Sequence, residues 1–318
     1  MAALQDQWQL TATALQYLPV GFGGYHWLAT DQAGSRWFVT VNEISAADSG
    51  HARTDFIAAM ETAASLASSG MNFLVAPTRS RTGDAAGWLR PEHAVTVFAY
   101  ADGASSTFDD TLTAAEKSTL IGMLAALHNA RSAVGAGPAP VRNMQLAERQ
   151  LLDNSIRERG RPWHSGPYAE PARALLEDYW HGLVRALAEF DGLIAAVGSD
   201  GRDLVITHGE PHPGNIIRSK AGLLLVDWDT VGLARPERDL WWVLSDHDKE
   251  SGRYTEQTGR EVSRDALALY RLRWTLDDIS LFLAEFQKPH RRSPDTEVSF
   301  AGLRDGLISL AGDRACSR

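Results

Sequence analysis

The chain has 318 residues, a formal net charge of −9 and 44% hydrophobic residues, an ordinary composition for a soluble globular protein with room for two lobes or two small domains. The negative charge argues against a nucleic-acid-binding surface and suits a cationic substrate, although solubility alone also accounts for it. One cysteine, Cys316, excludes an intrachain disulfide and a cysteine metal cluster. No stretch has the pattern of a leader peptide or a membrane span, so we expect a cytoplasmic protein.

The first hundred residues carry the pattern of a β-rich region with one helix. Glycine-rich residues 20–25 separate two apolar runs, which predicts a turn between strands. We expect strands with turns over residues 15–41, a helix over 54–69, a short strand over 73–77 and an apolar strand over 94–100.

From residue 113 the hydrophobic period becomes helical. Thr113 and Glu116 have the spacing of a capping box, and apolar residues then recur along one face of the predicted helix. We expect His128, near the end of that helix, to pack inside the protein rather than to bind a ligand. Further helices are predicted over residues 142–158, 170–197, 263–287 and 299–311.

Residues 204–229 form the most distinctive stretch of the chain. An apolar run ends in the polar loop His208-Gly209-Glu210-Pro211-His212-Pro213-Gly214-Asn215. Two short β-like runs follow, with a hairpin turn predicted at residues 219–222 between them. The second run leads directly into Asp227-Trp228-Asp229.

Three side chains of this stretch suit metal-assisted phosphoryl transfer. Asn215 and Asp227 are oxygen donors of the kind that Mg²⁺ prefers, and a hairpin can bring them together. Glu210 precedes Asn215 by five residues, so its carboxylate can lie beside the metal and accept a hydroxyl proton. The alternative is a polar loop whose side chains make turn hydrogen bonds only.

HGEPHPGN followed by LVDWD resembles the aminoglycoside phosphotransferase family, whose loop usually reads HGDxHxxN. The resemblance implies an α+β, protein-kinase-like two-lobe fold. A small nucleotide-binding lobe would cover residues 1–98, and a large, mostly helical lobe with the catalytic and substrate-binding residues would cover 99–318.

The resemblance also implies roles for single residues. Glu210 would be the catalytic base and His208 the loop histidine of the catalytic site, while Asn215 and Asp227 would be the metal ligands. Glu210 departs from the family, which normally has Asp here, and the longer side chain places the carboxylate one methylene farther out. Errors in reach near 1 Å can cost roughly a hundredfold in rate.

A nucleotide site follows from the same resemblance, with ATP expected, GTP as the alternative, and Mg²⁺ as the metal. Gly21, Gly23 and Gly24 lie in a turn that resembles the family's nucleotide-positioning loop, where backbone N–H groups approach phosphates. The segment that contains Phe98 and Tyr100 would be the hinge whose backbone holds adenine. An ordinary connection between a strand and a helix is the alternative.

Kinase-like enzymes carry a phosphate-binding lysine on the strand that corresponds to residues 36–41. Here Thr40 stands at the likeliest matching position, and the chain has no lysine before Lys117. Candidates for a substitute cation are His26, Arg36 and Arg53. Glu61, on the next helix, is expected to be a solvated helix residue rather than the partner of such a lysine.

Two further acidic positions have expected roles. Asp239 would anchor the catalytic loop, as a comparable acidic residue does in the family. Asp277 and Asp278 interrupt the apolar pattern of the helix over 263–287 and could face a cationic substrate. A solvated helix face is the alternative for this pair.

The implied activity is transfer of the γ-phosphoryl group of ATP to a hydroxyl of a small molecule. An aminoglycoside or aminocyclitol antibiotic is the first expectation, with a spectinomycin-phosphotransferase-like branch and a role in antibiotic resistance. One alternative is a kinase for a choline-like, sugar or natural-product alcohol. Another is a catalytically silent kinase-like protein that binds nucleotide, which Glu210 and the missing lysine motivate. We expect no nucleic-acid or membrane partner, and the sequence predicts no oligomeric state.

Overall fold

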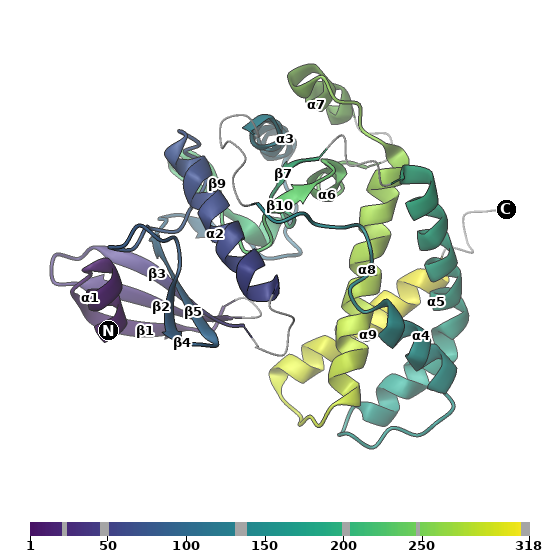
Figure 1. The fold of residues 1–318 in the computed structure, drawn as a ribbon. Coiled ribbons are helices and arrows are strands. Elements are labelled where there is room, and N and C mark those ends of the chain that lie inside the picture. The colour runs from purple at the N-terminus through teal and green to yellow at the C-terminus, as the bar shows by residue number, and fades with distance from the viewer. Residues whose placement is uncertain (21–23, 45–50, 131–138, 199–203, 246–248, 313–318) are drawn as a thin grey trace. The chain divides into compact units, whose positions relative to one another are not determined.

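The computed structural model describes residues 1–20, 24–44, 51–130, 139–198, 204–245 and 249–312 (Figure 1). The chain divides into two compact units. Unit 1 consists of residues 1–142 and 201–262, and unit 2 consists of residues 143–200 and 263–318. The expected lobe boundary at residue 98 lies inside unit 1 and stays a prediction.

Unit 1 begins with a five-stranded antiparallel sheet in the order β1-β2-β3-β5-β4 (Figure 1). Its strands are β1 (Ala12–Leu18), β2 (Gly24–Asp31), β3 (Arg36–Glu43), β4 (Gly87–Arg90) and β5 (His93–Ala99). Successive side chains of a strand point to opposite faces. One face of this sheet packs against helix α1 (Ala2–Trp8), where Leu4 and Trp8 join a buried cluster with the valines of β3 and β5. The β-rich region predicted for this part of the chain is confirmed.

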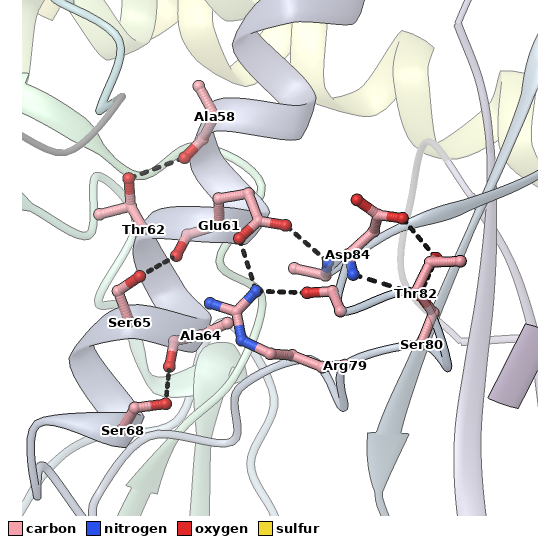
Figure 2. A network of polar contacts seen from close by, with 12 residues as sticks. Ala58, Glu61, Thr62, Ala64, Ser65, Ser68, Arg79, Ser80, Thr82 and Asp84 are labelled. Atoms are coloured by element: carbon pink, nitrogen blue, oxygen red, sulfur yellow. Dashed lines mark hydrogen bonds and ion pairs between the residues drawn. The ribbon is translucent and has the colours of Figure 1, made fainter.

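Helix α2 (His51–Ser68) follows the sheet's third strand and confirms the helix predicted over 54–69. Many of its residues are hydroxyl-bearing, and their side chains donate to carbonyls one turn earlier in the helix (Figure 2). This local bonding satisfies polar side chains without a partner outside the helix. The pairs are Thr62 to Ala58, Ser65 to Glu61 and Ser68 to Ala64.

Glu61 of α2 is not a solvated helix residue, so that expectation is wrong. Figure 2 shows its carboxylate pointing to the loop that follows the helix. Arg79 Nη1 donates to Glu61 Oε2 at 2.7 Å, and the Ala85 N–H donates to Oε1 at 2.6 Å. Arg79 Nη1 also donates to the Gly83 carbonyl at 2.7 Å. The loop thus supplies a cation and a backbone donor to this glutamate, which sequence periodicity does not reveal.

The structure describes residues 73–77 and they form no strand, so that prediction is wrong. Instead, Leu74 forms an isolated bridge with Leu225, and Pro77 forms one with Phe98. Proline has no N–H to donate to a sheet ladder, so pairing with β5 stays short at this point.

The central part of unit 1 contains two small sheets. One has the order β6 (Ala104–Ser105), β8 (Ile216–Ser219) and β9 (Gly222–Leu225), and the other pairs β7 (Val205–Thr207) with β10 (Gly232–Ala234). Ser219 pairs with Gly222, whose φ is +127°, so the predicted hairpin turn is confirmed. Helix α3 (Ala114–Asn129) begins with the predicted capping box, in which Thr113 and Glu116 satisfy each other's backbone N–H groups. Short helices α6 (Glu237–Leu240) and α7 (Glu250–Thr258) complete the unit.

Unit 2 is helical and has its own apolar core. Helices α5 and α8 run side by side and α9 contacts both of them (Figure 1). Leu176, Leu187, Leu276 and Phe286 are among its fully or almost fully buried side chains. The helices are α4 (Arg149–Glu158), α5 (Ala169–Val197), α8 (Arg264–Gln287) and α9 (Pro294–Gly312).

Helix α4 begins later than the predicted residue 142. Asn143 Oδ1 accepts the Gln145 N–H at 3.0 Å, a local side-chain bond that competes with helix formation. Helix α9 begins earlier than the predicted residue 299, because Ser293 Oγ accepts the Thr296 N–H and caps it. Within the described ranges, no helix combines the length and apolar character needed to cross a membrane.

Candidate active site

The loop that follows β7 makes a turn that only glycine fits. Gly209 has a φ of +105°, and the Arg238 guanidinium lies where a Cβ atom would be. Arg238 donates to Thr207 Oγ1 at 2.9 Å and to the Thr230 carbonyl at 3.0 Å. Thr230 Oγ1 in turn donates to the His208 carbonyl at 2.8 Å. Arg238 and Thr230 therefore fix the start of the loop, at Thr207 and His208, by hydrogen bonds.

Asp239 lies fully buried beneath this turn. Its carboxylate accepts the His208 N–H at 2.8 Å, the Gly209 N–H at 2.6 Å and His128 Nε2 at 3.0 Å. His128 is itself fully buried, and its Nδ1 lies 2.8 Å from the Tyr254 hydroxyl. Burial alone would raise the pKa of Asp239, but the hydrogen bond and charge of His128 bring it below its usual value. Asp239 and His128 thus occupy the structural positions predicted for them.

His208 joins the polar loop to the end of the hairpin that follows it. Its Nε2 donates to the Val226 carbonyl at 2.9 Å, and its Nδ1 accepts the Glu210 N–H at 3.2 Å. The ring packs edge-on against Trp228 with centroids 4.5 Å apart. Burial lowers the pKa of His208 to about 4, so the ring is neutral at pH 7. Because both nitrogens are engaged inside the protein, His208 supports the loop and does not touch a substrate.

The Asn215 side chain is oriented by the loop in which it lies. Asn215 Nδ2 donates to the Glu210 carbonyl at 2.9 Å and lies 3.3 Å from His212 Nε2. An amide nitrogen only donates, so His212 Nε2 is the acceptor. Both amide hydrogens are directed into the loop, which leaves Oδ1 as the oxygen available to a metal ion. The Asn215 carbonyl also accepts the Val226 N–H at 3.0 Å, which links Asn215 to the residue before Asp227.

Asp227 has an unusual backbone, with a φ of +66°. Few residues other than glycine adopt this conformation, and such strain is concentrated at functional sites. The fully buried Trp228 fixes the next position, since its Nε1 donates to the Leu225 carbonyl at 3.1 Å. The Asp227 side chain keeps an exposed surface, but partial desolvation of its carboxyl raises its pKa to about 8, and the charges of Asp229 and Glu210 add to this effect. Asp229 and Glu210 therefore each disfavour the ionised form of Asp227.

These residues fit a divalent cation held together with phosphate oxygens. Among the residues that the structure describes, no three His, Cys, Asp or Glu side chains form a complete metal site. Mg²⁺ does not need one, because it is commonly held by one or two carboxylates with water and substrate phosphates as further ligands. Burial also raises the pKa of Asp229, so ionised carboxylates at this position cost free energy when no cation is near. Asn215 and Asp227 offer hard oxygen donors where a cation would offset that charge.

Glu210 is held at both of its backbone groups. Its N–H donates to His208 and its carbonyl accepts from Asn215. Pro211 is buried beside it, and Pro213 begins the short 3₁₀ helix η2 (Pro213–Asn215). The loop therefore fixes the position from which the Glu210 carboxylate extends, and its role as the base stays a prediction.

The residues predicted to bind the nucleotide lie in the five-stranded sheet and after it. Gly21 and Gly23 lie outside the described residues, whereas Gly24 begins β2. Phe98 is half-buried on β5. The Tyr100 N–H donates to the Arg36 carbonyl at 3.1 Å, so that N–H is already used within the sheet. An adenine held by this segment would have to bind other backbone groups than the Tyr100 N–H.

The predicted substrate pair, Asp277 and Asp278, lies on α8 in unit 2. Both are half-buried, so neither belongs to a freely solvated helix face. Arg273 Nε donates to Asp277 at 3.1 Å. Burial raises the pKa of Asp278 to about 6, and the charge of Asp277 adds to it.

One aromatic cluster beside the loop was not predicted. The His212 ring packs against Phe108, with centroids 4.9 Å apart, and against Trp242 at 5.1 Å. Trp242 Nε1 also donates to the Gly209 carbonyl at 3.2 Å. The second histidine of the loop motif is the only hint of this cluster in the sequence, because Phe108 and Trp242 are distant along the chain.

Solved structures that are similar to the chain include phosphotransferases and kinases. The chain is similar to a spectinomycin phosphotransferase in complex with ADP and spectinomycin, at 14% identity and a TM-score of 0.78 over 98% of this chain and 95% of that one. It is similar to a microcompartment-associated aminopropanol kinase (15% identity, TM-score 0.61, 97% and 94% covered) and to an amicoumacin kinase solved with AMP-PNP and Ca²⁺ (16%, 0.60, 97% and 91%). At this identity the likeness shows the fold alone, and it confirms the predicted α+β, protein-kinase-like class.

No curated protein sequence matches the chain. A model of the phosphotransferase enzyme family, APH, matches residues 15–276, which include the loop and hairpin of residues 204–229. This chain therefore belongs to the APH phosphotransferase enzyme family and is a small-molecule phosphotransferase.

Proposed function

We propose that the protein transfers the γ-phosphoryl group of ATP, with Mg²⁺, to a hydroxyl of a small molecule that carries an amine. The observation that supports this most is the hairpin of residues 204–229. In it the charge of Glu210 acts on Asp227, and Asn215 is hydrogen-bonded both to the Glu210 carbonyl and to Val226, the residue before Asp227.

Each of these residues has one task in the proposed reaction. Asn215 and Asp227 would hold Mg²⁺, which neutralises charge on the transferring phosphoryl group when it is bound. Glu210 accepts the proton of the attacking hydroxyl. His208 and Asp239 hold the loop so that the Glu210 carboxylate meets the hydroxyl at a fixed distance.

The amine on the acceptor is supported by unit 2. Asp277 and Asp278 are adjacent, half-buried carboxylates, and one arginine side chain hydrogen-bonds to Asp277. Burial raises the pKa of both side chains, so ionised carboxylates here cost free energy that a ligand ammonium would offset. An aminocyclitol antibiotic is the first candidate, in keeping with the spectinomycin phosphotransferase of similar fold, and a simple amino alcohol is the second, in keeping with the aminopropanol kinase.

The experiment is ATP turnover on a panel of alcohols, with and without Mg²⁺. The panel pairs spectinomycin and aminopropanol with sugars and amine-free alcohols of similar size. We expect Mg²⁺-dependent ADP release only with amine-bearing acceptors, and a KM for the acceptor that rises with salt. Nucleotide binding without turnover on any alcohol would favour the silent kinase-like protein, and turnover limited to neutral alcohols would contradict the amine.

A further inference from the structure

The five-stranded sheet has one face that α1 does not cover. The buried cluster with Leu4 and Trp8 uses Val39, Val41, Val95 and Val97, which alternate with the residues of the other face. On that other face, the strand registers align side chains of β2, β3 and β5 in three rows. The rows are Gly24-Asn42-Ala94, His26-Thr40-Thr96 and Leu28-Phe38-Phe98.

These rows change from polar to apolar along the strands. The polar end lies at Gly24, the first residue of β2, and the apolar row lies toward the predicted hinge. Four residues separate the first row from the last along each strand, which is about 13 Å. Asn42, His26 and Phe38 are each partly exposed, whereas Thr40, Thr96 and Ala94 are buried, so the face is accessible at the first three side chains. It suits an elongated ligand with an aromatic base at one end and polar groups at the other.

His26 and Asn42 present hydrogen-bonding groups on this face. His26 Nδ1 lies 3.1 Å from Thr40 Oγ1, and its ring stacks on Phe38 with centroids 5.1 Å apart. Neither His26 Nε2 nor the Asn42 amide has a hydrogen-bond partner among the described residues. When Thr40 donates to Nδ1, Nε2 carries the ring proton and is a donor. Burial lowers the pKa of His26, which favours this neutral form.

Three arginines of the same region are engaged elsewhere. Arg36 forms an ion pair with Asp102, Arg53 lies over the Trp88 ring at 3.6 Å, and Arg79 is paired with Glu61. Arg36 precedes Asn42 by six residues of one strand, about 20 Å from it along the sheet. Glu61, the helix carboxylate that could orient a strand cation, is already held by the loop after α2.

We infer that His26 and Asn42, with Thr40 behind His26, bind the phosphates of the nucleotide through neutral hydrogen-bond donors, in the place where kinase-like enzymes carry a lysine. We call these three residues the polar strip. The inference rests on the proposed function, because it assigns the phosphate contacts of that nucleotide. The adjoining row of Leu28, Phe38 and Phe98 then receives the base.

The test compares ADP with adenosine, which lacks the phosphates. Calorimetric titration of the full chain with each ligand, in Mg²⁺ buffer, gives two dissociation constants per variant. Asn42→Ala and His26→Ala should each weaken ADP binding by about tenfold, since hydrogen bonds to charged groups are strong, and should change adenosine binding less than twofold. Asn42→Lys, which restores a cation, should tighten ADP binding by about tenfold. Tyr25→Phe is the matched control, because Tyr25 lies on the opposite face of β2 and is half-exposed.

The outcomes separate this inference from the proposed function. If the unmodified protein binds ADP and both alanine variants bind it as tightly, the polar strip is wrong while the nucleotide site stands. Equal weakening of ADP and adenosine would show a structural role only and would also overturn the inference. If the unmodified protein binds no ADP, the proposed function fails and the polar strip fails with it. If His26→Ala does not fold, Asn42→Lys still tests the inference: tighter ADP binding supports the polar strip, and unchanged or weaker binding overturns it.

Discussion

The catalytic loop and the open face of the sheet lie in the same unit but are built in opposite ways. In the loop, the backbone groups of His208, Gly209 and Glu210 are each bonded to a named side chain or carbonyl. On the sheet face, His26 and Asn42 expose groups that bond to no described residue. A backbone fixed by several hydrogen bonds suits a chemical step that depends on precise positioning. Exposed donors suit a ligand that binds and dissociates in every reaction cycle.

The contrast also concerns charge. The loop gathers the acidic side chains of Glu210, Asp227 and Asp229, of which Asp227 is exposed and the other two are half-buried, while the polar strip carries no formal charge near neutral pH. On the proposed reading, the cation that neutralises the phosphates is supplied mainly at the loop. Changes in the loop should therefore reduce turnover by orders of magnitude, whereas changes elsewhere should alter affinity or stability by smaller factors.

The largest effect is expected for Asp227→Asn, which removes the carboxylate that would bind the metal and keeps a residue that tolerates a positive φ. We expect turnover to fall by about a thousandfold, because charge stabilisation at the transferring group accounts for several kcal/mol. ATP should also lose most of its Mg²⁺-dependent stabilisation in thermal unfolding. Asp31→Asn, on β2, is the control. An unchanged Mg²⁺-dependent shift would remove Asp227 from the metal site.

Asp239→Ala tests whether the loop is as rigid as its hydrogen bonds indicate. The substitution leaves two buried loop N–H groups and His128 without their acceptor. We expect a loss of about 3–5 kcal/mol in the free energy of unfolding, measured with urea. The exposed Asp305→Ala should lose less than about 0.5 kcal/mol. Equal stability of both variants would contradict the anchoring role.

Glu210→Gln tests the base. We expect kcat to fall by about a hundredfold or more with little change in KM for ATP, because only proton acceptance is lost. Glu210→Asp should also lose rate, since its carboxylate falls short of the hydroxyl. A gain in rate for Glu210→Asp would instead mark Glu210 as an impaired base. Glu256→Gln, exposed on α7, should behave as the unmodified protein.

The smallest expected effect concerns Asp278, and its sign is a gain of stability. Burial raises its pKa from 3.8 to about 6, so its charge destabilises the folded state above pH 6, and protonation relieves this cost as the pH falls toward 4. The free energy of unfolding of Asp278→Asn should therefore exceed that of the unmodified protein by about 1–3 kcal/mol at pH 8, and the two should be equal near pH 4. Weaker binding of an amine-bearing acceptor should accompany the gain. Destabilisation at pH 8 would rule out an uncompensated charge.

Much of this architecture could be predicted because its signals are local. The turn at residues 219–222, the capping box of α3 and the long helices depend on neighbouring residues, and all are confirmed. The spacing of His208, Glu210 and Asn215 works in the same way. This spacing could be read locally, although Asp239 and Trp242, which hold the loop backbone, lie farther along the chain.

The features that escaped prediction depend on contacts between distant residues. Glu61 finds Arg79 only because the loop after α2 folds back on that helix, and His212 meets Phe108 and Trp242 from other parts of the chain. Sequence periodicity reports neither of these contacts. The strand predicted over residues 73–77 is wrong for a local reason instead, because Pro77 has no N–H to donate to a sheet ladder.

The residues that support the catalytic loop have a consequence for how such a protein diversifies. Asp239, His128 and Tyr254, which hold the loop, all belong to unit 1, whereas Asp277 and Asp278 belong to unit 2 with its separate core. If the loop transfers the phosphoryl group and unit 2 binds the acceptor, as proposed above, inherited changes in unit 2 would leave the bonds that hold the loop in place. A lineage built in this way would recruit new acceptors by altering one unit while the other is passed on nearly intact.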